Sequence, residues 1–312
     1  MPRKPRLDIQ GCIYHIINRG IEKRSIFLDD NDKKHFIDLL ARILTETNTM
    51  IFAFALIPNH FHILIMRGTT PVSDVMRSIT GGYAQYFNKK YNRSGYLFQG
   101  RYKAILCQKE PYFLELVRYI NLNPIRVGIV RTVSELSSYK FSSHPYISGK
   151  IKSDWFNPDH VLNQFASSEK KAIGRYIKFI EDGIGHKTDL SGGGLIRSLK
   201  YLGKSEEKIM YDDRVLGDGD FVYQVLLDEE GEKQKTNKVE FDALLSIVCN
   251  DYNLTASNIL GKTRVGNTPK ARATLAYLMS SKMGSSSSDI AKQLQCTSSA
   301  VSKMIGRASK ES

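Results

Sequence analysis

Residues Ile51–Met66, IFAFALIPNHFHILIM, decide how the N-terminal part of this chain folds. They predict an apolar strand, a break at the Pro-Asn pair and a second strand that opens with His60-Phe61-His62. Side chains two apart on a strand share a face, so His60 and His62 project together while Phe61 points the other way. Two imidazoles held in this way can bind one divalent metal, but two hydrogen-bonded histidines at a strand edge fit the same spacing.

The segments before this hairpin predict a strand and a helix. Cys12–Asn18 alternates as a strand, and its His15 is favoured as a structural histidine over a third metal ligand. Apolar residues at three and four spacing over Phe36–Leu44 predict a helix, with capping carboxylates in Asp29–Asp32. The order is therefore strand, helix, strand, strand.

The segments after the hairpin predict a helix and a basic strand. Thr70-Pro71 begins a helix whose apolar stripe reaches Phe87. Tyr96–Cys107 predicts a strand with Arg101 and Lys103 on one face. Basic and aromatic residues interleaved on a strand suit single-stranded nucleic acid, although an ordinary half-exposed strand has the same composition.

Glu110–Asn123 predicts a helix that Pro124 ends. Glu115, Tyr119 and Asn123 recur every four residues and form one polar stripe. A phenol that attacks a phosphodiester needs a nearby cation, and the Asn123 carbonyl could help to hold one beside Tyr119. The alternative is a surface tyrosine with a C-terminal capping asparagine.

The composition of the chain predicts its cellular compartment and the class of its binding partner. The chain of 312 residues can hold two or three domains, and it has neither a run of ~20 apolar residues nor a signal peptide. Its four cysteines show no paired spacing, so we expect reduced thiols and a cytoplasmic protein. The net charge of +13 predicts a polyanionic partner. Residues 1–130 carry 19 basic and 10 acidic side chains, residues 131–230 carry 14 and 16, and residues 231–312 carry 12 and 6.

The C-terminal part follows a charged linker, Glu229–Lys238. Asp289–Leu294, a short turn and Ser298–Arg307 predict a helix-turn-helix. A small helical module for protein–protein contacts is the alternative. The side chains expected to face DNA are Ser298, Ser299, Ser302, Lys303 and Arg307, joined by the basic residues Lys262, Arg264, Lys270 and Arg272.

Four of the N-terminal motifs together resemble the single-tyrosine HUH transposases, which include those of small insertion sequences and the REP-associated tyrosine transposases. The resemblance covers roughly residues 8–130 in the family's order. The motifs are Tyr14–Gly20, His60-Phe61-His62 after Pro58-Asn59, Phe98–Arg101 and Tyr119–Pro124.

This resemblance implies an α+β fold, an antiparallel sheet with flanking helices of the ferredoxin-like or RRM-like kind. It implies an enzyme in which His60 and His62 bind Mg²⁺ or Mn²⁺ and Tyr119 cuts single-stranded DNA, leaving a 5′-phosphotyrosine link and a free 3′-hydroxyl. Asn123 stands where the family has its third ligand, often Gln in insertion-sequence members. Tyr112 is the reserve nucleophile. The expected DNA contacts of this domain are Arg19, Arg101 and Lys103.

The segment Phe241–Ala308 resembles the C-terminal duplex-binding domain of the replication initiator DnaA, which implies sequence-specific binding of duplex DNA. We therefore predict three regions: a nuclease domain at 1–130, a helical connector at 131–230 and a helix-turn-helix domain at 238–312. A non-cleaving DNA-binding regulator and a replication-initiator nickase remain as alternatives. A homodimer, single-stranded or hairpin DNA and duplex DNA are the expected partners.

Overall fold

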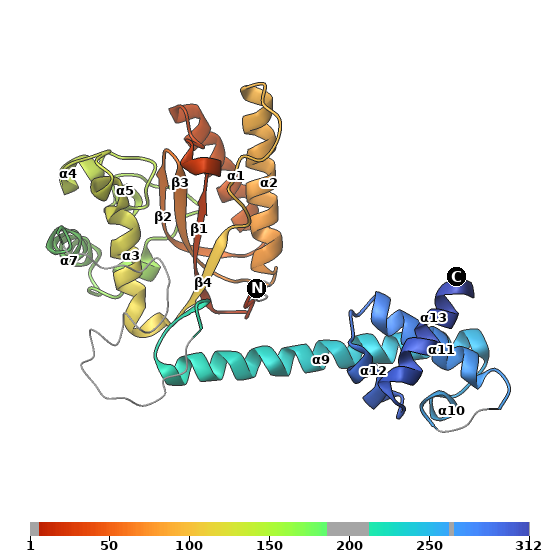
Figure 1. Cartoon of the computed structure of the whole chain (residues 1–312). Helices are drawn as coiled ribbons and strands as arrows, with labels where there is room; N and C mark the ends of the chain where they lie inside the picture. Colours follow the sequence, from red (N-terminus) through yellow and green to blue (C-terminus); the bar gives the residue numbers. More distant parts are fainter. Residues whose placement is uncertain (1–5, 186–211, 262–264, 312) are drawn as a thin grey trace. The chain divides into compact units, whose positions relative to one another are not determined.

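The computed structural model describes residues 6–185, 212–261 and 265–311. The chain forms two compact units, which we call the sheet unit, Met1–Leu226, and the helical unit, Leu227–Ser312. Each unit is described by itself (Figure 1).

The sheet unit is built on five strands in the order β2-β3-β1-β4-β5. Adjacent strands of the sheet pair antiparallel, except for β4 and β5, which pair parallel. The mixed α+β class and the antiparallel sheet predicted for this part are confirmed. The strands are β1 Ile13–Arg19, β2 Met50–Ile57, β3 His60–Met66, β4 Lys103–Cys107 and β5 Val215–Leu216.

Helices cover both faces of this sheet (Figure 1). On one face α1, Asp30–Glu46, and α2, Val72–Lys90, pack together, and the Phe36 ring of α1 lies 4.9 Å from that of Phe61 in β3. On the other face lies α3, Lys109–Arg126, whose Phe113 meets Phe52 of β2 edge to face at 5.1 Å. The short 3-10 helix η1, Ile21–Lys23, follows β1. The face of β3 that carries the two histidines is therefore the face that α3 covers.

Helix α3 continues past Pro124, and the prediction that the proline ends it is wrong. A proline has no N–H for the carbonyl four residues earlier, here that of Ile120. The Asn123 amide instead approaches this carbonyl, at 3.5 Å, and donates to the Tyr119 carbonyl at 2.8 Å. The helix consequently gains a last turn that carries Arg126.

The predicted connector packs on the sheet unit as far as Leu226 rather than forming a region of its own. The Ser143 N–H donates to the Phe54 carbonyl, and the Tyr139 hydroxyl donates to the Leu56 carbonyl, both in edge strand β2. The elements are α4 Val133–Leu136, α5 His144–Ile147, α6 Asp159–Leu162 and α7 Glu169–Asp182.

Helix α9, Gly219–Tyr252, replaces the charged linker predicted over 229–238. Lysine, glutamate and glutamine are good helix formers, so the charged composition of this segment is also compatible with a helix. The start of the helix, Gly219–Leu226, belongs to the sheet unit, and the rest of it belongs to the helical unit.

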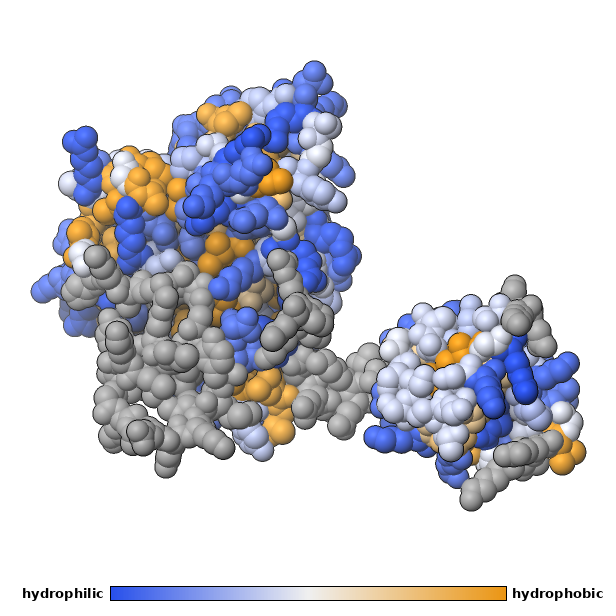
Figure 2. Space-filling view, viewed as in Figure 1, coloured by the Kyte–Doolittle hydropathy of each residue, from blue (hydrophilic) through white to orange (hydrophobic). Residues whose placement is uncertain are grey.

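The helical unit encloses its own apolar core. Val248, Ile259, Leu275 and Ile290 are fully buried in it, and the surface seen in Figure 2 is mostly hydrophilic or neutral. No helix in the described ranges is both long and apolar enough to span a membrane. The remaining helices are α10 Ala256–Leu260, α11 Thr268–Ser281, α12 Ser287–Gln293 and α13 Ser298–Glu311.

Asp32 ties the start of α1 to the end of α2. It forms a capping box with Asp29, inside the segment predicted to supply capping carboxylates. It also accepts from the Leu28 N–H and the Tyr91 hydroxyl, both at 2.8 Å, and pairs with Lys90 at 2.7 Å. Its side chain is fully buried. Burial acts to raise its pKa, but these hydrogen bonds outweigh burial and hold the pKa below its usual value.

We predict that Asp32→Ala lowers the free energy of unfolding by about 2–4 kcal/mol, because its buried donors lose their acceptor. A folded-state pKa below that of the unfolded chain stabilises at neutral pH, so the difference should shrink as the pH falls below about 4. Urea unfolding at several pH values measures it. The control is Asp38→Ala on the exposed side of the same helix, and equal losses in both variants would contradict the prediction.

Candidate functional site

The two histidines of β3 lie on the face covered by α3. In the sheet His62 pairs with Ile17 and His60 pairs with Arg19, so these four side chains share that face. The His60 and His62 ring centroids are 5.1 Å apart. Both side chains are buried, while Arg19 is exposed. The predicted projection of the pair from one face is confirmed.

Each imidazole uses its Nδ1 in a hydrogen bond within the protein. His60 Nδ1 lies 2.6 Å from Oδ1 of Asn59, whose Nδ2 donates to the Lys23 carbonyl. Because that amide oxygen can only accept, Nδ1 of His60 carries the proton and Nε2 keeps its lone pair. His62 Nδ1 lies 2.9 Å from Nε2 of the fully buried His15.

Burial keeps both histidines neutral. Desolvation, with a smaller contribution from Arg19, lowers the pKa of His60 to about 4. The pKa of His62 also lies well below its usual value, again mainly because of burial, with further effects of His15 and His60. A neutral imidazole is the form that binds a metal.

Tyr119 projects from α3 toward this face of the sheet. Its ring centroid lies 5.7 Å from that of His62 and 5.9 Å from that of His15, edge-on in both cases. Burial raises the pKa of its phenol, and Arg126 and Arg19 oppose that rise. The structure therefore brings together the predicted nucleophile and the predicted histidine pair. Tyr112, the reserve nucleophile, is half-buried one helical repeat earlier.

Asn123 lies one turn after Tyr119 and is buried. Its Nδ2 is occupied by the hydrogen bond to the Tyr119 carbonyl, so Oδ1 is the atom left to bind a cation. The predicted ligand set thus offers two imidazole nitrogens and one amide oxygen. Among the described residues, at this site or outside it, no group of three or more His, Cys, Asp or Glu side chains is arranged to hold a metal, so the predicted set depends on the Asn123 amide oxygen as its third donor.

Arg126 is a site residue that the sequence analysis missed. Its guanidinium carbon lies 4.7 Å from the Tyr119 ring centroid, and Nη1 donates to the Tyr119 carbonyl at 2.9 Å. The Arg126 side chain is exposed overall, but partial desolvation, more than the nearby Arg118, lowers the pKa of its guanidinium, and Tyr119 opposes that change. Within the described ranges neither Arg126 nor Arg19 has a carboxylate partner. Arg126 is seven residues after Tyr119, a spacing that puts both side chains on one face of a continuous helix. It was missed because the helix was expected to end at Pro124.

The two other basic residues predicted to contact DNA lie near the far edge of the sheet. Lys103 begins β4 and pairs with Ile17, so it shares the face of His62 two strands away. Arg101 lies just before β4 and is exposed. Lys103 therefore adds a basic side chain to this face beyond Arg19.

Residues 8–123 match the family model described as IS200-like transposase. Over this segment the chain is similar to the IS200-like transposases. The match contains β1–β4, the histidine pair, Tyr119 and Asn123. It ends before Arg126 and before the helical unit. No curated protein matched the chain.

Two solved structures are similar to part of this chain. One is a REP-associated tyrosine transposase bound to a REP hairpin, which is 18% identical, with 50% of this chain and 94% of the other covered and a TM-score of 0.41. The other is a protein from Deinococcus radiodurans R1 described as a transposase, which is 17% identical, with 38% and 94% covered and a TM-score of 0.28.

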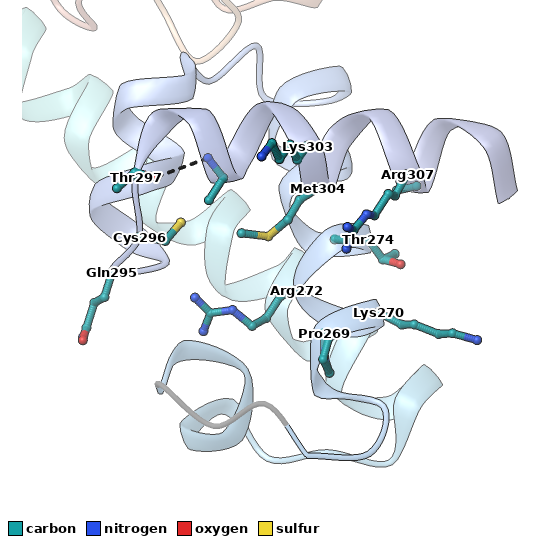
Figure 3. A pocket seen from close by; sticks show the side chains of 13 residues that line it. Pro269, Lys270, Arg272, Thr274, Gln295, Cys296, Thr297, Lys303, Met304 and Arg307 are labelled. Carbon is teal, nitrogen blue, oxygen red and sulfur yellow. Dashed lines mark hydrogen bonds between the residues drawn. The ribbon is translucent and has the colours of Figure 1, made fainter.

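The residues predicted to form a second interface lie in or next to the helical unit's α11–α13 region. Helices α12 and α13 are separated by a short turn at 294–297, and Ile290, Leu294 and Val301 are buried between them. A hollow of about 760 Å³ lies between this turn, α11 and α13 (Figure 3). The side chains predicted to face DNA are exposed on α11 and α13: Lys270, Ser298, Ser299, Ser302, Lys303 and Arg307. Lys262 and Arg264 lie outside the described residues.

Arg272 differs from its predicted role as a DNA contact. Its guanidinium donates to the backbone carbonyls of Ile259, Gly261 and Leu294. These bonds join α11 to the end of α10 and to the turn after α12. The side chain therefore ties the helices of the unit together, whereas Lys270 in the same helix lies at the rim of the hollow and extends outward from it (Figure 3).

We predict that Arg272→Ala lowers the free energy of unfolding of the helical unit by about 2–4 kcal/mol, because three carbonyls lose a charged donor. Lys270→Ala, the control in the same helix, should leave stability unchanged. Urea unfolding combined with hydrogen exchange of α10 and α12 measures both variants. A stable Arg272→Ala protein that fails to bind duplex DNA would instead return Arg272 to the interface.

Proposed function

We propose that this protein is a transposase that cuts and rejoins single-stranded DNA in a metal-dependent reaction, with Tyr119 as the nucleophile. The observation that carries the proposal is the packing of the Tyr119 ring against His62, beside His60 and two arginines that lack a carboxylate partner in the described residues. The cytosol, where DNA is within reach, is the proposed compartment.

The residues of the site fit a divalent cation such as Mg²⁺ or Mn²⁺. Nε2 of His60 keeps its lone pair, His62 is neutral, and Oδ1 of Asn123, one turn after Tyr119, is the third neutral donor that we propose for the set. Such an ion, when bound, neutralises charge on the phosphate and polarises its phosphorus–oxygen bonds. Because the donors carry no negative charge, the site stays positive and favours an anionic substrate.

The reaction balances without a nucleotide cofactor. The Tyr119 oxygen bonds to phosphorus as its phenolic proton leaves, the bond from phosphorus to the 3′ oxygen breaks, and that oxygen takes up a proton. The products are a 5′-phosphotyrosine and a free 3′-hydroxyl. One phosphoester replaces another, so the 3′-hydroxyl can reverse the step and rejoin the strand.

Arg126 and Arg19 are the cations proposed to hold the scissile phosphate. One N–H of Arg126 is fixed on the Tyr119 carbonyl, which directs the planar guanidinium across the phenol ring. Its remaining N–H groups can bind phosphate oxygens in the fork geometry typical of arginine. Arg19 approaches from β1, opposite His60.

We further propose that the helical unit binds duplex DNA with α13 and the rim of the hollow beside it. Exposed Lys270, Lys303 and Arg307 surround this hollow, and small hydroxyl side chains line the start of α13. Basic side chains position a protein on the phosphate backbone, and hydroxyls at the start of a helix suit contacts within a groove. Duplex binding here would raise the local concentration of the nuclease near its target.

Tyr119→Phe is expected to abolish a covalent protein–DNA adduct while preserving the ring that packs on His15 and His62. Labelled single-stranded fragments from around the gene, incubated with Mn²⁺ and resolved after denaturation, measure the adduct. His60→Ala should lose it as well, and Tyr112→Phe, the matched control, should keep it.

An adduct that survives in Tyr119→Phe and disappears in Tyr112→Phe would contradict the assignment of the nucleophile. Tight binding without an adduct from any fragment would favour the non-cleaving regulator. An adduct formed only at a replication origin would favour the initiator nickase.

For the helical unit, Lys303→Ala with Arg307→Ala should weaken binding of the full chain to a duplex and reduce its salt dependence by about one log–log slope unit per lost phosphate contact. Lys282→Ala with Lys292→Ala removes the same charge from exposed positions outside the hollow. Filter binding at several salt concentrations compares the two pairs. Equal losses would show that only the total charge matters.

A further inference from the structure

His15 is a buried residue that the proposed reaction does not yet use. It lies on β1, fully buried, with Nε2 2.9 Å from Nδ1 of His62. The two rings stack with centroids 5.2 Å apart and planes 25° apart. The same imidazole meets the Tyr119 ring edge-on at 5.9 Å. His15 therefore touches both a proposed metal ligand and the proposed nucleophile.

We propose that His15 is a positioning residue that keeps the proton of His62 on Nδ1 and the Nε2 lone pair free for a divalent cation. The inference rests on the proposed metal role of His60 and His62. Ligating histidines usually donate their other ring N–H to a fixed partner, and this partner orients the ring. The structure offers His62 no comparable partner for Nδ1 among the described contacts except His15.

The chemistry of the bond explains why the partner matters. A neutral imidazole has one donor nitrogen and one acceptor nitrogen, so in a bond between two imidazoles only one donates. When His15 Nε2 accepts, His62 holds its proton on Nδ1 and Nε2 is a lone pair. In the reverse arrangement Nε2 of His62 would carry the proton and could not bind a metal.

The two ligands are positioned by different means. His60 donates to an amide oxygen that can only accept, because the same amide donates to the Lys23 carbonyl. His62 depends on an imidazole that can exchange roles with it. Whether Nε2 of His62 has a lone pair for a metal therefore depends on which of the two imidazoles donates in the bond between His62 and His15.

The test measures Mn²⁺ affinity of the full chain without DNA, from the electron paramagnetic resonance signal of the free ion. His15→Phe keeps a flat ring but offers no acceptor, and it should weaken Mn²⁺ binding by roughly 10–100-fold. His15→Gln can place an amide oxygen near His62 and should recover part of the affinity. His144→Phe removes a buried histidine outside the site, so it controls for loss of stability.

A second readout is nitrogen NMR of the imidazoles, which should show the Nδ1–H form of His62 in the wild type and a mixture of forms in His15→Phe. Unchanged Mn²⁺ affinity and an unchanged His62 form in His15→Phe would overturn the inference. Affinity lost equally in His144→Phe would also overturn it, since stability would then explain the effect. Unchanged affinity in His62→Ala would overturn the proposed metal role itself, and the inference with it.

Discussion

The antiparallel register between β1 and β3 is the constraint on which the site depends. It sets Ile17 opposite His62 and Arg19 opposite His60. A shift of one residue would turn both histidines to the face where Phe61 now packs against Phe36. Burying that phenylalanine and its apolar neighbours therefore holds the histidines in place on the opposite face. The apolar side of β3 determines where its polar side points.

Across from the sheet, the last two turns of α3 supply the groups that complete the site. The Asn123 amide and the Arg126 guanidinium both donate to the backbone carbonyl of Tyr119, so one oxygen atom links the three residues. The neutral histidines and the cationic arginines give a site that attracts anions. A divalent cation and a DNA phosphate would each be bound better in the presence of the other, since the phosphate supplies the negative charge that the protein ligands lack.

The sequence was sufficient for what depends on local periodicity. The histidine pair follows from the two-residue repeat of a strand, and Tyr119 and Asn123 follow from the four-residue spacing of a helix. Arg126 was missed because a side-chain amide, invisible in a propensity pattern, compensates for the N–H that Pro124 lacks. The bond between His15 and His62 joins residues 47 positions apart and depends on strand register and ring orientation. Arg272 looked like a surface cation because only the folded unit shows the three carbonyls around it.

The segments after α3 have a consequence for how the enzyme could work. Helix α3 is held to the sheet on one side, and beyond it Tyr139 and Ser143 bond to β2, while Arg118 stacks on Phe179 of α7 at 4.2 Å. If the expected homodimer exchanged α3 between its two copies, these contacts would have to break as well. The tyrosine already lies beside the histidines of its own chain. A single molecule thus contains every group proposed for strand cleavage, and the rate of that step would be first order in protein.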